Sequence, residues 1–175
     1  MANGYYTGFL EYKNLDMEKT YNYTKPKPII LECGTCNEYS FTTESSILFM
    51  TNPHQVCMPI ALGNVSIDTK CLCRPKVKID FSCNVHFVEL DMTGYVQIEF
   101  LLYRMFNFKQ EILIGSWFFR EVIESAQTFN IFYCDTNVFP ECYQYSIRCK
   151  IIDMDASNIN ITNCHIAALA QSGCD

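Results

Sequence analysis

The sequence predicts an all-β protein, an antiparallel β-sandwich of the jelly-roll kind with an extended N-terminal arm. Three observations support this prediction. Apolar and polar residues alternate with period two in several segments, turn-forming residues separate those segments, and little of the chain shows the helical period. About eight to ten short strands spaced in this way are typical of jelly-roll or immunoglobulin-like sandwiches.

The clearest strands are expected in the middle and near the end of the chain. Every second residue is apolar from Val77 to Phe87, and the same alternation returns from Tyr143 to Ile151, as expected for strands buried on one face. Further strands are predicted at Ile29–Cys33, Ile47–Met50, Val56–Leu62, Val65–Thr69, Tyr95–Met105, Ser116–Val122, Thr128–Cys134 and Ile159–Ala168. Gly63-Asn64 is expected to form a turn, and Gln110–Ile114 and Glu121–Gln127 to hold a helical turn each.

Residues 1–28 differ from the rest of the chain and are predicted to form the arm, which leaves residues 29–175 as the jelly-roll domain. The arm has no cysteine, is rich in tyrosine and ends in Lys25-Pro26-Lys27-Pro28, which favours extended backbone. It either packs on its own domain or adds to a neighbouring subunit as a strand. Its expected aromatic anchors are Tyr5, Tyr6, Phe9, Tyr12, Tyr21 and Tyr23.

The composition excludes several classes of protein. Of 175 residues, 49% are hydrophobic, 14% aromatic and only 18% charged, and the formal net charge is −6. One core has ample apolar material, so general disorder is excluded. Scattered Lys and Arg in an acidic chain argue against nucleic acid or an anionic membrane as a partner. Low charge and many aromatics are typical of subunit interfaces, although strands favour the same residues.

Neither a signal peptide nor a membrane span is expected. The opening residues 1–6 contain no basic region and no apolar one. The most apolar stretch, residues 98–108, is interrupted by Glu99, Arg104 and Asn107. Yet the chain carries 11 cysteines, a load typical of extracellular proteins. A protein that is made in a cytoplasm and meets oxidant only after its producing cell lyses would reconcile these observations.

Disulfides are the expected use of the cysteines. The C-x-x-C at Cys33 and the C-x-C at Cys71 together suggest a zinc site, but the second spacing is uncommon for zinc. Because the cysteine count is odd, at least one cysteine remains after internal pairing, either for intermolecular bonding or as a reactive thiol. We expect no metal and no other cofactor. The candidates for disulfides between subunits are Cys33, Cys36, Cys71, Cys73 and Cys174.

No motif of an enzyme is present in the sequence. It lacks a nucleophile elbow, a phosphate-binding loop, a dinucleotide-binding fingerprint and a zinc-protease helix. His54, His86 and His165 are isolated from one another, so they are expected to be structural or solvated. Cys83 and Cys149 occupy apolar positions of their strands and are expected in the core.

Several segments carry a family resemblance. They are Lys27-Pro28-Ile29-Ile30-Leu31-Glu32-Cys33-Gly34, residues 65–81 around Cys71-Leu72-Cys73-Arg74-Pro75, Gly115-Ser116-Trp117-Phe118-Phe119-Arg120, Phe129-Asn130-Ile131-Phe132-Tyr133-Cys134-Asp135 and Ile166-Ala167-Ala168-Leu169-Ala170. Over residues 27–170 the chain resembles a cysteine-rich family of unknown function found in clostridial endospore formers. Its setting is similar to that of endospore appendage (Ena-type) fibre subunits, jelly rolls that polymerise through an N-terminal connector and disulfides. Those connectors carry cysteines, whereas residues 1–28 here have none.

The resemblance implies a self-assembling structural subunit of a disulfide-stabilised extracellular fibre, appendage or surface layer on endospores. Its partners would be copies of itself, joined through the arm and disulfides, and a spore-surface anchor protein. It would be made in the mother-cell cytoplasm without a signal peptide and end on the spore surface. The alternative is a lectin-like or tumour-necrosis-factor-like trimeric jelly roll that acts as a binding module. Neither hypothesis makes the protein an enzyme.

Overall fold

The computed structural model describes residues 27–42, 58–88, 94–107, 109–122, 125–155 and 158–173. All the regular elements in these ranges are β-strands. They are β1 (Ile29–Cys33), β2 (Thr35–Cys36), β3 (Tyr39–Thr42), β4 (Ile60–Asp68), β5 (Pro75–Val88), β6 (Tyr95–Phe106), β7 (Glu111–Glu121), β8 (Ser125–Asp135), β9 (Cys142–Asp155) and β10 (Asn158–Ser172). In the part of the chain so described, no helix has the length and apolar character needed to cross a membrane.

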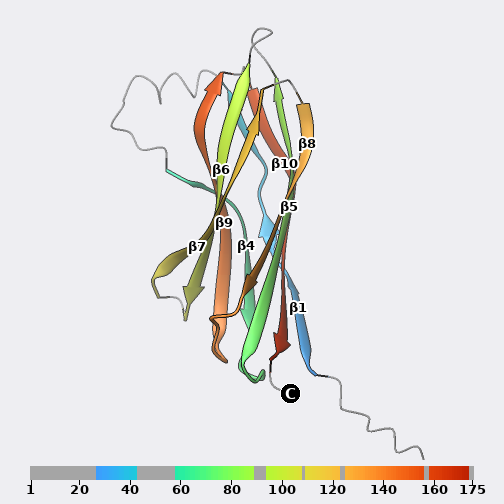
Figure 1. The fold of residues 1–175 in the computed structure, drawn as a ribbon, viewed down its shortest axis with the longest axis vertical. Coiled ribbons are helices and arrows are strands. Elements are labelled where there is room, and N and C mark those ends of the chain that lie inside the picture. The colour runs from blue at the N-terminus through green and yellow to red at the C-terminus, as the bar shows by residue number, and fades with distance from the viewer. Residues whose placement is uncertain are drawn as a thin grey trace, which may run out of the picture.

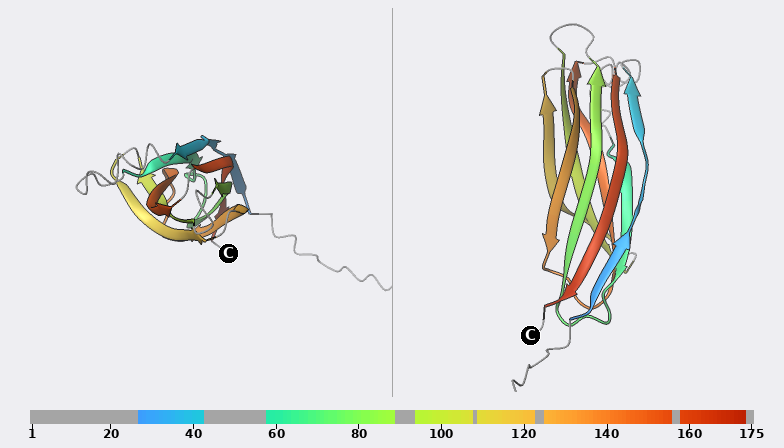
Figure 2. Two further views of the ribbon diagram at one scale, coloured as in Figure 1. Left: turned by 90° about the horizontal axis from the view of Figure 1, so that it is seen from above. Right: turned by 90° about the vertical axis from the view of Figure 1, so that its right-hand side faces the viewer.

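The strands form two antiparallel sheets that enclose an elongated interior (Figure 1 and Figure 2). The first sheet has the order β1-β10-β5-β8, with β3 also paired to β10, and the second has the order β2-β4-β9-β6-β7. From β4 to β10 the chain changes sheet at every connection except the β6–β7 hairpin. Such crossings define a jelly roll, so the predicted fold class is confirmed.

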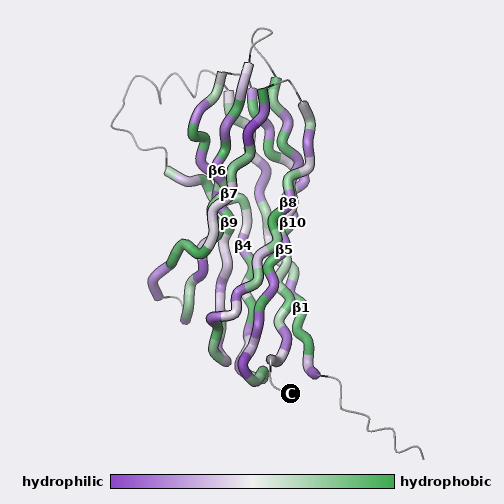
Figure 3. Tube along the Cα trace, viewed as in Figure 1, coloured by the Kyte–Doolittle hydropathy of each residue, from purple (hydrophilic) through white to green (hydrophobic). Residues whose placement is uncertain are grey.

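The core lies between the sheets and follows from the period-two alternation. Along β5 the inward residues from Val77 to Phe87 are at most 2% exposed, and the polar residues between them face outward. From the opposite sheet, β9 contributes Tyr145, Ile147 and Cys149 to the same core cluster. The alternation is visible along the strands in Figure 3. Burial of these two apolar faces is the main force that holds the sheets together.

Two strands that the sequence separates are one strand in the structure. Residues 60–68 form a continuous β4, so the turn predicted at Gly63-Asn64 is wrong. Gly63 instead pairs with Cys36 of β2, and a Cβ added to Gly63 would lie 2.5 Å from the Cys36 Sγ. A close approach of two side-by-side strands therefore explains this glycine, not a turn.

The two predicted helical turns are also wrong. Ile112 and Leu113 pair with Arg104 and Tyr103 in the β6–β7 ladder, and residues 125–127 pair with β5. Hydrogen bonding to a neighbouring strand overrides the weak local preference in both segments. The strand predicted at Ile47–Met50 lies outside the described residues.

A β-bulge in β10 changes which residues of that strand face the core. Before the bulge Ile161 points inward, and after it Cys164 does. The extra residue, Asn163, has a φ of 50°, a left-handed conformation that Asn adopts more readily than most residues. Its N–H donates to Glu38 Oε1 at 3.0 Å. The bulge therefore lies opposite Cys83 of β5, at the point where the pairing register of β5 and β10 shifts.

The first and last strands of the described chain are neighbours. Ile29 of β1 pairs with Gln171 of β10 in antiparallel register. The described chain therefore starts and ends at the same end of the sandwich (Figure 1).

Candidate functional site

The cysteines of the described chain differ sharply in exposure. The exposed free thiols are Cys33, Cys71 and Cys134, the partly buried ones are Cys36 and Cys142, and the buried ones are Cys83, Cys149 and Cys164. Cys73 is disulfide-bonded. Cys174 lies outside the described residues. Among the described residues, only these three cysteines are both free of a disulfide and exposed to solvent.

Two of the exposed thiols lie on the outer face of the β1-β10-β5-β8 sheet. Cys33 of β1 pairs with Ala167 of β10, which pairs in turn with Asp80 of β5. Cys134 of β8 pairs with Lys78, one row along the same face. β1 and β8 occupy the two ends of this sheet order. Since neighbouring strands lie about 4.8 Å apart, the three strand spacings place the thiols at opposite edges of one face, roughly 14 Å apart across the sheet.

Apolar side chains accompany these thiols on the outer face of the sheet. Leu31 is 62% exposed and Phe132 is 68% exposed. The Lys78 Nζ lies 4.9 Å from the centre of the Phe132 ring and 2.8 Å from Asp80 Oδ1. Exposed apolar area beside both thiols is typical of a surface that contacts another molecule.

A shallow groove of about 330 Å³ crosses the same face at the β10 bulge. Its lining includes Cys33, Phe132, Cys164 and His165. His86 lies elsewhere on the face, half-buried on β5, and His54 is outside the described residues. Within the described ranges no three His, Cys, Asp or Glu side chains are grouped so that they could hold a metal ion.

The interior thiols lie in an apolar environment that favours their protonated form. Burial raises the pKa of Cys149 to about 12 and that of the half-buried Cys36 to about 11. A hydrogen bond to Cys164, together with burial, raises the pKa of Cys83. The same hydrogen bond lowers the pKa of Cys164, because the Cys83 thiol donates to the Cys164 sulfur. The sequence-based expectation that Cys83 and Cys149 are core residues agrees with their burial.

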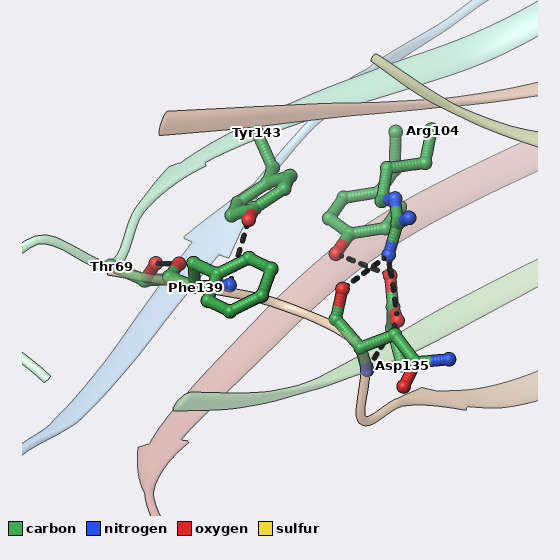
Figure 4. Close-up of polar contacts among 7 residues, drawn as sticks. Thr69, Arg104, Asp135, Phe139 and Tyr143 are labelled. Atoms are coloured by element: carbon green, nitrogen blue, oxygen red, sulfur yellow. Dashed lines mark hydrogen bonds and ion pairs between the residues drawn. The ribbon is translucent and has the colours of Figure 1, made fainter. Parts of the chain in front are cut away.

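A second group of polar residues lies at the end of β8 (Figure 4). The Asp135 carboxylate is 3% exposed and accepts hydrogen bonds from Arg104 Nη1 at 2.9 and 2.7 Å. It also accepts from the Tyr145 hydroxyl at 3.0 Å and from the Asn137 N–H at 3.1 Å. Burial, followed by the charge of Asp135, raises the pKa of Tyr145. These donors hold the Asp135 carboxylate in one position at the end of β8.

The connection from β8 to β9 is held by further bonds near this carboxylate. The Thr69 hydroxyl lies 3.0 Å from the Phe139 carbonyl oxygen and 2.9 Å from that of Glu141. The Tyr143 hydroxyl accepts from the Phe139 N–H at 2.8 Å. The group joins strands of both sheets and fixes the connection between them, so its function is structural.

The predicted site residues differ in their exposure and in their bonding. Cys33 and Cys71 are exposed, Cys36 is turned toward the core, and Cys73 is already bonded. The aromatic anchors assigned to the arm, namely Tyr5, Tyr6, Phe9, Tyr12, Tyr21 and Tyr23, lie outside the described residues. Sequence reasoning overlooked Cys134, although its place between the inward-facing Tyr133 and Asp135 was a usable signal for an outward side chain.

The described strands define an antiparallel jelly-roll β-sandwich. The chain belongs to the family described as a domain of unknown function (DUF4489), whose model matches residues 27–171. This match agrees with the extent of the resemblance found from the sequence. No curated protein matches the chain.

Several solved structures resemble the fold at low sequence identity. A chain in the structure of infectious bursal disease virus Gx strain has a TM-score of 0.46 at 9% identity, covering 83% of this chain and 33% of that chain. The Gt strain gives 0.44 at 10% identity, with 85% and 34% covered. Eiger TNF from S. frugiperda gives 0.41 at 9% identity, with 85% and 97% covered. The present chain thus spans about a third of the length of the viral chains.

Proposed function

We propose that the chain is a self-assembling structural subunit of an extracellular fibre, appendage or surface layer, stabilised by disulfides between copies and located on the endospore surface. In this proposal it is made in the mother-cell cytoplasm, has no catalytic activity, and is attached through a spore-surface anchor protein. The observation that carries the proposal is the placement of the free thiols Cys33 and Cys134 at opposite edges of one sheet face.

This placement supports a chain of subunits more than a closed pair. A bond from Cys33 of one copy to Cys134 of the next is head-to-tail, so each copy keeps a free thiol at its other edge. Repetition of such a contact gives an open filament or a ring. Each bond converts two thiols to one disulfide, and oxygen or small disulfides outside the producing cell accept the two electrons and two protons.

Noncovalent contacts would set the register before the thiols are oxidised. The exposed Leu31 and Phe132 beside the two cysteines supply apolar area for this contact. The arm, residues 1–28, is proposed to add to a neighbour with its tyrosines as anchors. Among the described residues β7 and β8 are each paired along one edge only, so each offers backbone hydrogen-bonding groups to such a strand.

The covalent part is tested on thiol-blocked native material in a denaturing gel with and without reductant. We expect a ladder that collapses to the 20.3 kDa chain on reduction. Cys33→Ser and Cys134→Ser variants are each expected to lose the ladder, whereas Cys149→Ala, which alters a buried thiol, keeps it. A single monomer band in both lanes for the wild-type chain would remove the covalent mechanism.

The arm requires a separate test. Deletion of residues 1–25 is expected to shorten or disorder the polymers seen by electron microscopy while the thiols remain in place. Polymers of unchanged length and order would remove the arm from the proposal. A closed trimer in sedimentation, insensitive to reductant, would instead support the binding-module alternative.

A further inference from the structure

A pair of thiols inside the sandwich is not used by the proposed assembly. Cys83 on β5 lies opposite the β10 bulge, between the paired positions Asn84–Thr162 and Ser82–His165. The bulge turns Cys164 inward at the same level, so the two side chains lie on adjacent strands and face the same interior. Cys83 is 1% exposed and Cys164 is 9% exposed.

The two thiols lie close enough for each to shift the pKa of the other. Cys164 Sγ also lies 3.9 Å from the carbonyl oxygen of Thr162, which is across the bulge on its own strand. Because the register shifts at the bulge, Cys83 lies opposite both Asn163 and Cys164. Directly opposed residues on antiparallel strands have Cα atoms about 4.5–5.5 Å apart, within the range of about 4.4–6.8 Å that a disulfide requires.

The other interior thiols are less suitable partners for Cys164. Cys149 belongs to β9 of the opposite sheet, and facing sheets lie about 10 Å apart. Cys36 lies on the short strand β2, where its sulfur packs over Gly63. Cys83 is the one described thiol on a strand hydrogen-bonded directly to β10 at the level of Cys164.

Cys164 lies nearer to the solvent than Cys83 does, at 9% against 1% exposure. Cys164 is one of the residues that line the groove of about 330 Å³ on the outer face of the first sheet. Cys83 does not line that groove. A small molecule in the groove therefore lies next to Cys164 and not next to Cys83, which is on the neighbouring strand.

We propose that Cys83 and Cys164 form a redox-modification site, in which a small disulfide entering the groove converts the two thiols to a disulfide between β5 and β10. The Cys164 thiolate attacks one sulfur of the small disulfide, and a mixed disulfide forms as the first small thiolate leaves. The Cys83 thiolate then attacks the Cys164 sulfur, and the second small thiolate leaves. The two protein thiols lose two electrons and two protons, and the small disulfide gains both to become two thiols.

The electrostatics of the pair suit this order of events. The hydrogen bond from Cys83 favours the thiolate of Cys164, the group that meets the oxidant first. After the first step, loss of that thiolate removes the interaction that holds the Cys83 proton. The pair is thus arranged as an attacking and a resolving cysteine.

The test uses the full chain, fully reduced and kept folded, with cystamine as the small disulfide. Remaining free thiols are alkylated at acid pH, and the protein is digested without reductant for peptide mass spectrometry. We expect a peptide from β5 joined to one from β10 through Cys83 and Cys164, lighter by two hydrogen atoms than the two free peptides. Modification of the exposed Cys33 in the same sample shows that the oxidant was active.

Variants distinguish the site from chance oxidation. In Cys83→Ala, Cys164 is expected to accumulate the cysteamine mixed disulfide, because its resolving thiol is gone. Cys149→Ala, the matched buried-thiol control, is expected to retain the Cys83–Cys164 bridge. Circular dichroism checks that each variant is folded. Recovery of Cys83 and Cys164 as free thiols in the oxidised wild-type chain, or a bridge from Cys164 to Cys36 or Cys149, would overturn the proposal.

Discussion

Arg104 and Asp135 form an ion pair that joins the two sheets of the sandwich. Arg104 lies on β6 of the second sheet and Asp135 ends β8 of the first. Nη1 of the arginine is 2.9 and 2.7 Å from the two carboxylate oxygens. Since Asp135 is 3% exposed and the Arg104 side chain 15%, solvent screens this pair only weakly where it joins the sheets.

Replacing Asp135 by Ala is expected to lower the free energy of unfolding by about 3 kcal/mol, because it leaves the largely buried Arg104 without its counter-charge. Urea unfolding followed by tryptophan fluorescence measures the loss. The control is Glu111→Ala, which breaks the more exposed Arg148–Glu111 pair and should cost less than about 1 kcal/mol. Equal losses in the two variants would contradict the assigned role of Asp135.

The buried Cys149 thiol predicts a loss of stability in alkali. Burial raises its pKa from 9.0 to about 12, so the folded protein binds this proton more tightly than the unfolded chain does. Its contribution is therefore fully present below pH 9 and is lost as the pH rises toward 12, by at most about 1.4 kcal/mol per pH unit.

Urea unfolding of the reduced protein at several values between pH 8.5 and 11 tests this dependence. Cys149→Ala is expected to flatten the decline, whereas Cys134→Ala, at an exposed position, should leave its slope unchanged. An identical slope in the wild-type protein and Cys149→Ala would refute the assignment.

Gly63 is expected to tolerate no larger residue while Cys36 is opposite. In Gly63→Ala the new Cβ would meet the Cys36 sulfur at 2.5 Å and the Thr35 carbonyl oxygen at 2.9 Å, so we expect a destabilisation of about 2 kcal/mol. Thermal unfolding of the double variant Gly63→Ala/Cys36→Ala should recover part of that loss, since the sulfur is gone. Strictly additive effects would show that the two residues do not interact.

The cysteines are expected to react with iodoacetamide in two groups. Cys33, Cys71 and Cys134 are exposed and should be alkylated in the folded reduced protein at least about 100-fold faster than the buried Cys83 and Cys149. Peptide mass spectrometry after timed quenching gives the rates. In urea the two groups should react alike, and a persistent difference there would mean that burial is not the cause.

The alternation of apolar residues was enough to predict the jelly roll and most of its strands. It succeeded along β5, where inward apolar residues and outward polar residues alternate without interruption from Val77 to Phe87. It failed where pairing with distant residues decides the conformation, as at Gly63, which is glycine because Cys36 lies against it. Likewise, the segment at Ile112 is extended because β6 pairs with it.

Surface chemistry was less predictable than the fold. Sequence spacing singled out Cys33 and Cys71, but it gave no indication that Cys134 lies on the same face as Cys33, since that relation passes through two intervening strands. The hydrogen bonds of Asp135 could not be predicted from the sequence either, because their side-chain donors, Arg104 and Tyr145, come from β6 and β9. The same holds for the Cys83–Cys164 pair, which depends on the β10 bulge.

The pairing of Ile29 with Gln171 also governs how the module responds to mechanical tension. Since these strands run antiparallel and leave at the same end, pulling the two chain ends apart loads the β1–β10 hydrogen bonds one after another and peels the strand away. Tension applied between Cys33 and Cys134 crosses β1, β10, β5 and β8 nearly at right angles to the strands. Because Cys33 is the last residue of β1, both directions of pulling load the β1–β10 hydrogen bonds from one end of that strand.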